Sequence, residues 1–458
     1  MISKKEKQAK DDQVVEKRTA SEAGWSLSRY NLNALVPGKN VVAIANLFKG
    51  TFAEYSPLEL FLLSKLDELD EHHPIIERFA KRGIITRVDE LAALEMMGRV
   101  SCAEPRGFGL TICPTMACNF DCTYCFEKHR SGKMSPEVQN DVVNLARRLL
   151  KACGGKHLPV TWFGGEPMLA VDLIESMSER LMALAEEFGA EYSATIVTNG
   201  YLLTQENINI LNRCKITLCQ ITIDGLGEMH DATRHLAGGG ATFDRIIGNL
   251  RNSKIPFRIC IRQNVQESNF SSVPKVKEFI EMLAEESGNS LFYEPNLVRR
   301  NKASEERGTQ STLLCGTDSS DIGIMRETGR FSSGRGYYCG ASGIWFIVID
   351  ENGNLFKCWE SIGDPTNAFA TVHDWDPNNP LDTAYAPDKF TMYVNTSLPT
   401  TDKECLECIW LPMCVGGCPY HRLHYEKVCF PFKNQPEKFV LALHDRLQEQ
   451  KRKKSLSK

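Results

Sequence analysis

Residues 110–125 read LTICPTMACNFDCTYC, a short apolar stretch that leads into three closely spaced cysteines. The apolar stretch is typical of a buried strand, and the cysteines would follow it on a loop. Zinc sites and four-iron clusters take four ligands, but no fourth cysteine follows at a usual spacing. The sequence therefore predicts a metal centre at Cys118, Cys122 and Cys125 with its last ligand supplied from elsewhere. A zinc site completed by His129 is the alternative interpretation.

From residue 110 to about residue 299, stretches typical of strands alternate with amphipathic helical stretches. The strand-like stretches are LTICPT, LPVTWFGG, SATIVTNG, ITLCQITIDG, FRICIRQNV and SLFYEPNLV. Such alternation is the signature of a parallel sheet whose strands are joined by helices. We therefore expect an α/β fold, a partial (β/α)6 TIM-like barrel over residues 106–305, with functional side chains at the carboxyl ends of its strands.

The segments on either side of the barrel differ from it in composition. Residues 1–27 are rich in charge, and we expect them to be disordered. Residues 28–105 contain short strands followed by short helices, which predicts a winged-helix-like module with an exposed strand edge that would recognise a peptide. Residues 306–435 are rich in cysteine, glycine and proline, and we expect a metal-organised domain there. Residues 436–458 predict a C-terminal helix and a basic tail.

Composition excludes several classes of protein. The chain of 458 residues mixes 54 basic with 58 acidic residues for a net charge of -4, so no nucleic-acid partner is expected. The longest apolar runs suit buried strands, and the N-terminus lacks an apolar signal. We therefore expect a cytoplasmic protein with no membrane partner. In such a protein, 17 cysteines indicate metal binding rather than disulfides.

Ten of the cysteines fall into three local sets. The first is Cys118, Cys122 and Cys125; the second is Cys339 and Cys358; the third is Cys405, Cys408, Cys414, Cys418 and Cys429. The remaining cysteines are scattered, and we expect them to be small buried apolar residues: Cys102, Cys113, Cys153, Cys214, Cys219, Cys260 and Cys315.

The first set resembles the motif of radical S-adenosylmethionine (radical SAM) enzymes, and further motifs support the resemblance. These are WFGGEP at 162–167, TNG at 198–200, TIDG at 222–225, HDATR at 230–234 and RQN at 262–264. The resemblance implies that the three catalytic cysteines hold a [4Fe-4S] cluster whose fourth iron is ligated by S-adenosylmethionine. It also implies cofactor contacts by Tyr124, Gly164, Gly165, Glu166, Thr198, Asn199, Thr222, Asp224, Arg234 and Asn264.

The third set resembles the SPASM extension of radical SAM enzymes, which implies two auxiliary [4Fe-4S] clusters. Carried over residue by residue, the distal cluster would be held by Cys405, Cys408, Cys414 and Cys429. The proximal cluster would be held by Cys339, Cys358 and Cys418, which is one ligand short. Either Cys315 completes it, or one iron stays open to substrate.

Two features depart from the sulfatase-maturating enzymes, which carry a further cysteine where this chain has Trp345 and an aspartate directly after the cysteine equivalent to Cys358. This chain has Cys358-Trp359-Glu360 there, so Glu360 is the candidate catalytic base.

The combination of segments resembles the maturases of ribosomally made peptides. The resemblance implies a 5'-deoxyadenosyl radical that abstracts hydrogen from a precursor peptide to install a thioether, carbon–carbon or ether cross-link. It also implies two partners, a precursor peptide with its leader and a flavodoxin or ferredoxin as electron donor. Two alternatives are a sulfatase-type maturase that forms formylglycine and a radical SAM enzyme acting on a small molecule.

Overall fold

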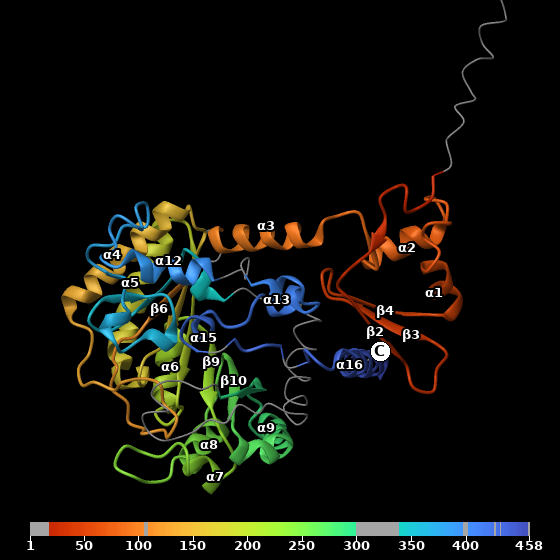
Figure 1. The fold of residues 1–458 in the computed structure, drawn as a ribbon. Coiled ribbons are helices and arrows are strands. Elements are labelled where there is room, and N and C mark those ends of the chain that lie inside the picture. The colour runs from red at the N-terminus through yellow and green to blue at the C-terminus, as the bar shows by residue number, and fades with distance from the viewer. Residues whose placement is uncertain are drawn as a thin grey trace, which may run out of the picture.

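The computed structural model describes residues 18–104, 109–298, 339–396, 402–425, 427–430 and 432–456. Cys315 lies outside the described residues. The described strands form a nine-stranded, a three-stranded and a two-stranded sheet. Figure 1 shows the large sheet and the three-stranded sheet on opposite sides of the molecule, with helix α3 (Glu90–Ala103) running between them.

Six parallel strands make up most of the nine-stranded sheet, and they lie side by side in the order of the sequence. They are β6 (Gly109–Ile112), β7 (His157–Trp162), β8 (Glu191–Thr198), β9 (Ile216–Thr222), β10 (Arg258–Val265) and β11 (Leu291–Leu297). Each predicted strand stretch forms one of them, and the α/β fold class is confirmed. Because β11 is an outer strand of the sheet and does not pair with β6, the six strands form an open array, as in a partial barrel.

The sheet continues into the cysteine-rich region. Strand β12 (Phe346–Ile349) pairs in parallel with β6, and β13 (Asn354–Phe356) and β14 (Ala370–Thr371) follow in antiparallel pairing. Strands from both sides of the domain boundary expected at residue 306 therefore belong to one sheet. It also follows that the segment between Cys339 and Cys358 is hydrogen-bonded to the strand that leads into the first cysteine loop.

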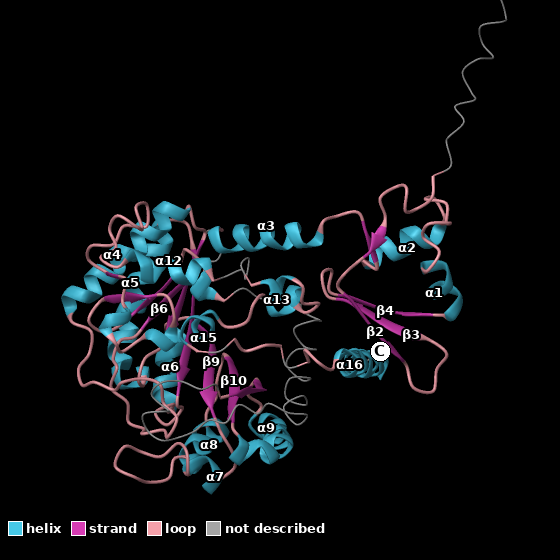
Figure 2. Ribbon diagram, viewed as in Figure 1, coloured by secondary structure: helices cyan, strands magenta, loops and turns pink. Residues whose placement is uncertain are grey.

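Helices pack around this sheet, as the colours of Figure 2 make clear. Their bounds are α4 (Pro136–Cys153), α5 (Val171–Glu187), α6 (Gln205–Arg213), α7 (Glu228–Asp231), α8 (Phe243–Asn252) and α9 (Val273–Ser287). Helix α4 begins at the capping side chain of Ser135 and ends at Gly154, whose φ of 57° favours glycine. Fully buried residues such as Leu145, Leu181 and Ile246 join these helices to the strands in one apolar core.

The N-terminal module contains the expected strands and helices. Strands β2 (Asn31–Leu35), β3 (Val42–Asn46) and β4 (Thr51–Tyr55) are antiparallel, with β3 in the middle, and α1 (Pro57–Leu63) and α2 (Pro74–Arg82) follow. Helix α3 was not expected from the sequence. The prediction of disorder over residues 1–27 needs correction for residues 18–27, because Ala20 is fully buried and β1 (Ser26–Leu27) pairs with β5 (Ile85–Thr86).

The C-terminal part is built from short helices and one long helix. Their bounds are α12 (Pro387–Asn395), α13 (Lys403–Leu406), α14 (Leu411–Cys414), α15 (Pro419–His424) and α16 (Pro436–Leu456). Short 3₁₀ turns are η2 (Pro167–Ala170), η3 (Glu267–Ser272), η4 (Gly340–Ser342), η5 (Trp359–Ser361) and η6 (Pro365–Asn367). In the described part of the chain, no helix has both the length and the apolar character needed to span a bilayer.

Helix α16 packs against the N-terminal sheet, although the two are far apart in sequence. Tyr30 and Leu32 of this module share a core with Phe439 of α16 and with Trp410 of the third cysteine set. The Trp410 ring stacks on Phe430 with centroids 4.5 Å apart. The N-terminal module, the third cysteine set and the C-terminal helix therefore share one apolar core, and most of the expected basic tail is helical.

Candidate active site

A cavity of about 840 Å³ lies where the parallel strands meet the second cysteine region. The carboxyl ends of β8, β9, β10 and β11 contribute Thr198, Thr222, Asn264 and Leu297 to its wall. Five cysteines from two of the predicted sets also line it: Cys118, Cys122, Cys125, Cys339 and Cys358. The fold thus brings the first cysteine set and the second together around one space.

The first cysteine loop, defined here as residues 113–134, is held by its backbone. The amides of Asp121 and Thr123 donate to the carbonyls of His235 and Thr233 at 3.0 Å, and the amide of Ala237 donates to the carbonyl of Asn119 at 2.9 Å. These bonds fix the loop against the segment that follows α7. Backbone contacts with its neighbours therefore hold this part of the loop in place.

The three thiols of this loop are close enough to influence one another. Burial raises the pKa of the Cys118 thiol to about 12, and the charges of Glu166 and Cys122 add to the rise. The pKa of the Cys125 thiol is raised by burial and then by Glu127 and Cys122. In the described residues, no three His, Cys, Asp or Glu side chains surround a single point in the manner of a one-ion site. The cysteines line the cavity instead, with His129 Nε2 at 3.6 Å from Cys125 Sγ.

The glycine turn after β7 fits closely against this loop. A Cβ atom at Gly164 would overlap the carbonyl oxygen of Thr115, and one at Gly165 would overlap that of Ala117. Gly164 also has a φ of 111°, which disfavours other residues. The two glycines therefore let this turn pack directly on the first cysteine loop, and both also line the cavity.

Glu166 is buried, and its carboxylate oxygens accept hydrogen bonds from other groups of the protein. It accepts hydrogen bonds from the amide of Met168 at 2.9 Å, from Thr198 Oγ1 at 2.6 Å and from the amide of Asn199 at 2.7 Å. Asn199 Nδ2 in turn donates to Asn119 Oδ1 at 2.8 Å. Three predicted cofactor residues, Glu166, Thr198 and Asn199, thus form a network that joins β7, β8 and the first cysteine loop.

A second buried network surrounds the Tyr124 hydroxyl. This hydroxyl donates to Asp224 Oδ2 at 2.5 Å and accepts from Arg234 Nη1 at 2.8 Å and from Asn264 Nδ2 at 3.1 Å. Burial raises the pKa of both Tyr124 and Asp224. Four predicted cofactor residues are therefore brought together, and Thr222 lies nearby on the cavity wall.

The remaining cysteines form two groups. Burial raises the pKa of the Cys358 thiol, and the charges of Cys339, Glu360 and Cys418 raise it further, so these groups lie close together. A separate pocket is lined by the other group, Cys405, Cys408, Cys414 and Cys429. The structure thus brings together the same two groups of three and four cysteines that the resemblance implied.

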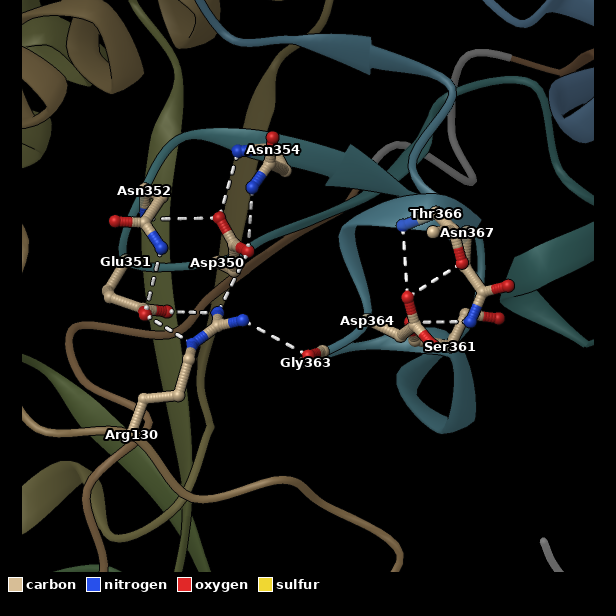
Figure 3. A network of polar contacts seen from close by, with 10 residues as sticks. All are labelled: Arg130, Asp350, Glu351, Asn352, Asn354, Ser361, Gly363, Asp364, Thr366 and Asn367. Atoms are coloured by element: carbon tan, nitrogen blue, oxygen red, sulfur yellow. Dashed lines mark hydrogen bonds and ion pairs between the residues drawn. The ribbon is translucent and has the colours of Figure 1, made fainter.

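The cavity has two walls: the first is formed by the first cysteine loop and the carboxyl ends of the parallel strands, and the second by the segments that carry Cys339, Cys358 and Glu360. Sequence reasoning missed Arg130, which connects the segments that form the two walls. Its guanidinium binds both carboxylate oxygens of Glu351 at 2.9 and 3.0 Å, Asp350 Oδ2 at 3.2 Å and the carbonyl of Gly363 at 3.0 Å. Figure 3 shows this side chain reaching from the first cysteine loop to the turns on either side of β13 and Cys358. Asp350 is fully buried, and the guanidinium of Arg130 is the positive charge that its carboxylate would otherwise lack.

Lys357 and Trp359, on either side of Cys358, were also missed. The Lys357 ammonium is buried and donates to the carbonyls of Gly343 at 2.5 Å and Phe346 at 2.6 Å, while burial lowers its pKa to about 7. The Trp359 ring stacks on Phe163 with centroids 4.5 Å apart. Neither residue belongs to a motif, and only the tertiary contacts identify them.

Glu127 is a fourth residue that the sequence did not single out. Its side chain lines the cavity and is 5% exposed. Burial raises the pKa of this carboxyl to about 8, and the charges of Glu166 and Glu360 contribute. Its Oε2 atom has no hydrogen-bond partner among the described residues.

Known proteins resemble this chain in sequence. The model of the radical SAM superfamily matches residues 112–260. A cysteine-type anaerobic sulfatase-maturating enzyme from Clostridium perfringens is 24% identical over 350 residues, which cover 66% of this chain and 85% of that enzyme. The sporulation killing factor maturation protein SkfB from Bacillus subtilis is 26% identical over 216 residues, or 46% of this chain and 48% of that protein.

Solved structures resemble it in fold. The structure of anSMEcpe with bound AdoMet and a peptide superposes with a TM-score of 0.55 at 22% identity, and the match covers 75% of this chain and 98% of that one. Streptococcus suis SuiB bound to S-adenosylmethionine gives a TM-score of 0.50 at 16% identity and covers 88% of this chain and 99% of that one. At such identities the likeness concerns the fold. The chain therefore contains a radical SAM domain over residues 112–260, which includes the first cysteine set.

Proposed function

We propose that this enzyme is a radical SAM maturase that modifies a precursor peptide made by the ribosome and installs a cross-link in it. The observation that carries this proposal is the shared cavity, in which the first cysteine loop faces Cys339 and Cys358. A radical formed at one wall would act on a substrate held against the other. The cavity volume of about 840 Å³ is large enough for amino-acid side chains of a peptide.

The residues of the first wall fit the cofactors that the superfamily implies, a [4Fe-4S] cluster and S-adenosylmethionine. Cys118, Cys122 and Cys125 would hold the cluster, and the backbone of Gly164 and Gly165 would border the cofactor. When bound together, these groups supply a 5'-deoxyadenosyl radical. The Tyr124 network and the Glu166 network would keep the wall rigid, so that little reorganisation accompanies binding.

The residues of the second wall fit a role toward the substrate. We propose that Cys339, Cys358 and Cys418 hold a proximal auxiliary cluster and that its fourth iron position is open or filled by Cys315. The distal set, Cys405, Cys408, Cys414 and Cys429, would hold another. Glu360 lines the cavity close to Cys358 and is the proposed base.

The N-terminal module is the proposed site for the leader of the precursor peptide. Strand β4 pairs with β3 along one edge and is an outer strand of its sheet. An extended peptide would add to its other edge through backbone hydrogen bonds. Helix α1, which follows β4 directly, exposes Leu58 and Phe61 and would offer apolar contacts to the same peptide.

A sulfatase-type maturase is the second candidate, because the Clostridium relative carries that name and matches over most of its own length. The two candidates differ in product. Cross-linking removes two hydrogens from the peptide and introduces no aldehyde, whereas formylglycine contains an aldehyde that reacts with hydrazides. In this chain Glu360 stands one residue later than the aspartate of the sulfatase-maturating enzymes, which favours the cross-linking candidate.

The test uses the full-length protein, reconstituted with iron and sulfide under anaerobic conditions and reduced with dithionite. It is incubated with S-adenosylmethionine and with synthetic precursor peptides encoded beside it. Mass spectrometry should find 5'-deoxyadenosine and a peptide that is two hydrogens lighter and does not react with a hydrazide. A hydrazide-reactive product would instead establish the sulfatase-type activity, and absence of 5'-deoxyadenosine would contradict both.

A further inference from the structure

Arg422 connects the two groups of cysteines that are proposed to hold auxiliary clusters. It lies on α15, the short helix that begins directly after Cys418, and its backbone amide donates to the Cys418 carbonyl at 3.1 Å. Its side chain reaches the distal set, where Nη1 donates to the sulfur of Cys405 at 3.7 Å and to the carbonyl of Gly416 at 3.1 Å. One residue therefore contacts a proposed ligand of each auxiliary cluster.

The positive charge of Arg422 is permanent, because a guanidinium group does not lose its proton in proteins. The side chain is 14% exposed, so water screens this charge only in part. A cysteine that binds metal is a thiolate, which accepts hydrogen bonds and donates none. The guanidinium, which only donates, therefore suits a Cys405 that serves as a ligand.

Two carboxylates lie close to this contact, and both are paired with lysines. Asp402 Oδ2 lies 3.3 Å from the Cys405 sulfur, and Lys427 donates to this oxygen at 2.9 Å and to Glu404 at 2.7 Å. Lys433 also pairs with Glu404. Counting the guanidinium, these contacts join three cations to two carboxylates, so the lysines balance the acidic groups and the guanidinium adds a net positive charge beside the sulfur.

We propose that Arg422 raises the reduction potential of the cluster held by the distal set. The inference rests on the proposed function, which assigns a four-iron cluster to these cysteines. A reduced cluster carries one more negative charge than an oxidised one, so a fixed positive charge and a hydrogen bond to a ligand sulfur stabilise the reduced form. Arg422 is thus a positioning residue, because it contacts a ligand of the cluster and not the substrate.

The test is a redox titration of the anaerobically reconstituted full-length protein, followed by electron paramagnetic resonance. The parent protein carries Ala in place of the three thiols of the first cysteine loop, so that the auxiliary clusters alone give the signal. Arg422→Gln removes the charge, and Arg422→Lys keeps the charge without the planar guanidinium. Lys403→Gln is the control, because Lys403 is 88% exposed and pairs with Glu407 at 3.9 Å.

We expect the parent protein to show two reduction waves, one for each auxiliary cluster. In Arg422→Gln one wave should move to lower potential, so that the ratio of reduced to oxidised cluster at a given potential falls about tenfold, or about 59 mV for one electron. The other wave should stay in place, Arg422→Lys should show a smaller shift, and Lys403→Gln should show none. Two unchanged waves in an Arg422→Gln protein that keeps its iron overturn the inference.

Iron analysis accompanies each titration. If Arg422→Gln loses about four irons, the comparison passes to Arg422→Lys, in which the same loss of iron or the absence of a shift overturns the inference. A parent protein with a single wave would contradict the distal cluster itself and with it the inference. Formation of 5'-deoxyadenosine and modified peptide by the wild type tests the proposed function separately, so the two can fail independently.

Discussion

The two walls of the cavity are held in place in different ways. The first cysteine loop is bonded through its backbone to the segment around Thr233 and His235 and is packed against the turn at Gly165. The loop that carries Cys358 and Glu360 follows β13. It contacts the first wall through side chains, chiefly Arg130 and Trp359. Backbone bonds survive most substitutions, whereas side-chain contacts such as those of Arg130 and Trp359, called the join here, do not.

This difference has a consequence for the proposed reaction. The first wall would keep the same shape whether or not a substrate is present, because its networks are closed within the protein. The walls are joined by backbone where β12 pairs with β6 and the amide of Cys113 donates to the carbonyl of Ile349 at 2.9 Å. The loop after β13 is held further by long-range side-chain contacts, such as that between Arg130 and Asp350, 220 residues apart. Substitutions at the join should therefore affect the second wall while leaving the first intact.

The largest effect should come from removing the thiols of one wall at a time. We expect about twelve irons per chain after reconstitution, as three four-iron clusters. Changing Cys118, Cys122 and Cys125 together to Ala should abolish 5'-deoxyadenosine formation and leave about eight irons. The matched variant, with Ala at Cys339, Cys358 and Cys418, should still cleave S-adenosylmethionine but not modify peptide. Iron analysis and chromatography measure both, and cleavage by the first variant would contradict the assignment.

The next effect concerns the join at Arg130. Arg130→Gln leaves the carboxylates of Asp350 and Glu351 without their cation, and we expect a loss of about 2–3 kcal/mol in the free energy of unfolding. Hydrogen exchange should rise in residues 350–364 while the backbone of the first cysteine loop stays protected. Lys128→Gln is the control, because its exposed ion pair with Asp364 at 3.5 Å should contribute about 0.5 kcal/mol or less. Equal exchange in both variants would show that Arg130 does not join the walls.

Much of the first wall could be predicted from the sequence, and little of the join. The strands and helices of the barrel follow from periodicity, because each is a local pattern with one buried side. The cysteine spacing and the glycine turn are also local. Arg130, Lys357 and Glu127 differ, since each stands next to a motif but owes its role to groups that the fold brings from elsewhere.

The same limit explains the misplaced ends of the chain. Residues 18–27 look disordered by composition, yet Ala20 is buried because the N-terminal module folds over it. The C-terminal helix looks isolated in the sequence, yet Phe439 shares a core with Tyr30. Burial of this kind depends on tertiary partners and leaves no local pattern to read.

The third prediction concerns how the free energy of unfolding depends on pH through a buried histidine beside the first wall. His230 is fully buried, its Nδ1 accepts from the amide of Asp224, and burial lowers its pKa to about 3 from 6.5. At pH values between about 3 and 6.5 this imidazole binds a proton in the unfolded chain but not in the folded protein. The free energy of unfolding therefore falls as the pH falls below 6.5. From about pH 7 to about pH 5 this group should remove about 2 kcal/mol.

The matched variant is His230→Asn, which keeps an acceptor for the Asp224 amide but cannot titrate. Urea unfolding of both proteins at the two pH values isolates the contribution of His230 from that of the carboxyl groups. We expect the wild type to lose more stability than the variant. Equal losses in the two proteins would show that His230 is not the acid-sensitive group of the first wall.

The smallest effect concerns the second contact of the join. Trp359 Nε1 donates to Thr111 Oγ1 of β6 at 3.0 Å, while its ring stacks on Phe163. Trp359→Phe keeps the stacking and loses the hydrogen bond, so we expect a loss of about 1 kcal/mol in the free energy of unfolding. A double-mutant cycle with Thr111→Val measures the coupling between the two side chains. If the coupling is near zero, Arg130 is the main side-chain contact that holds the loop after β13, and its substitution should loosen that loop while the pairing of β12 with β6 persists.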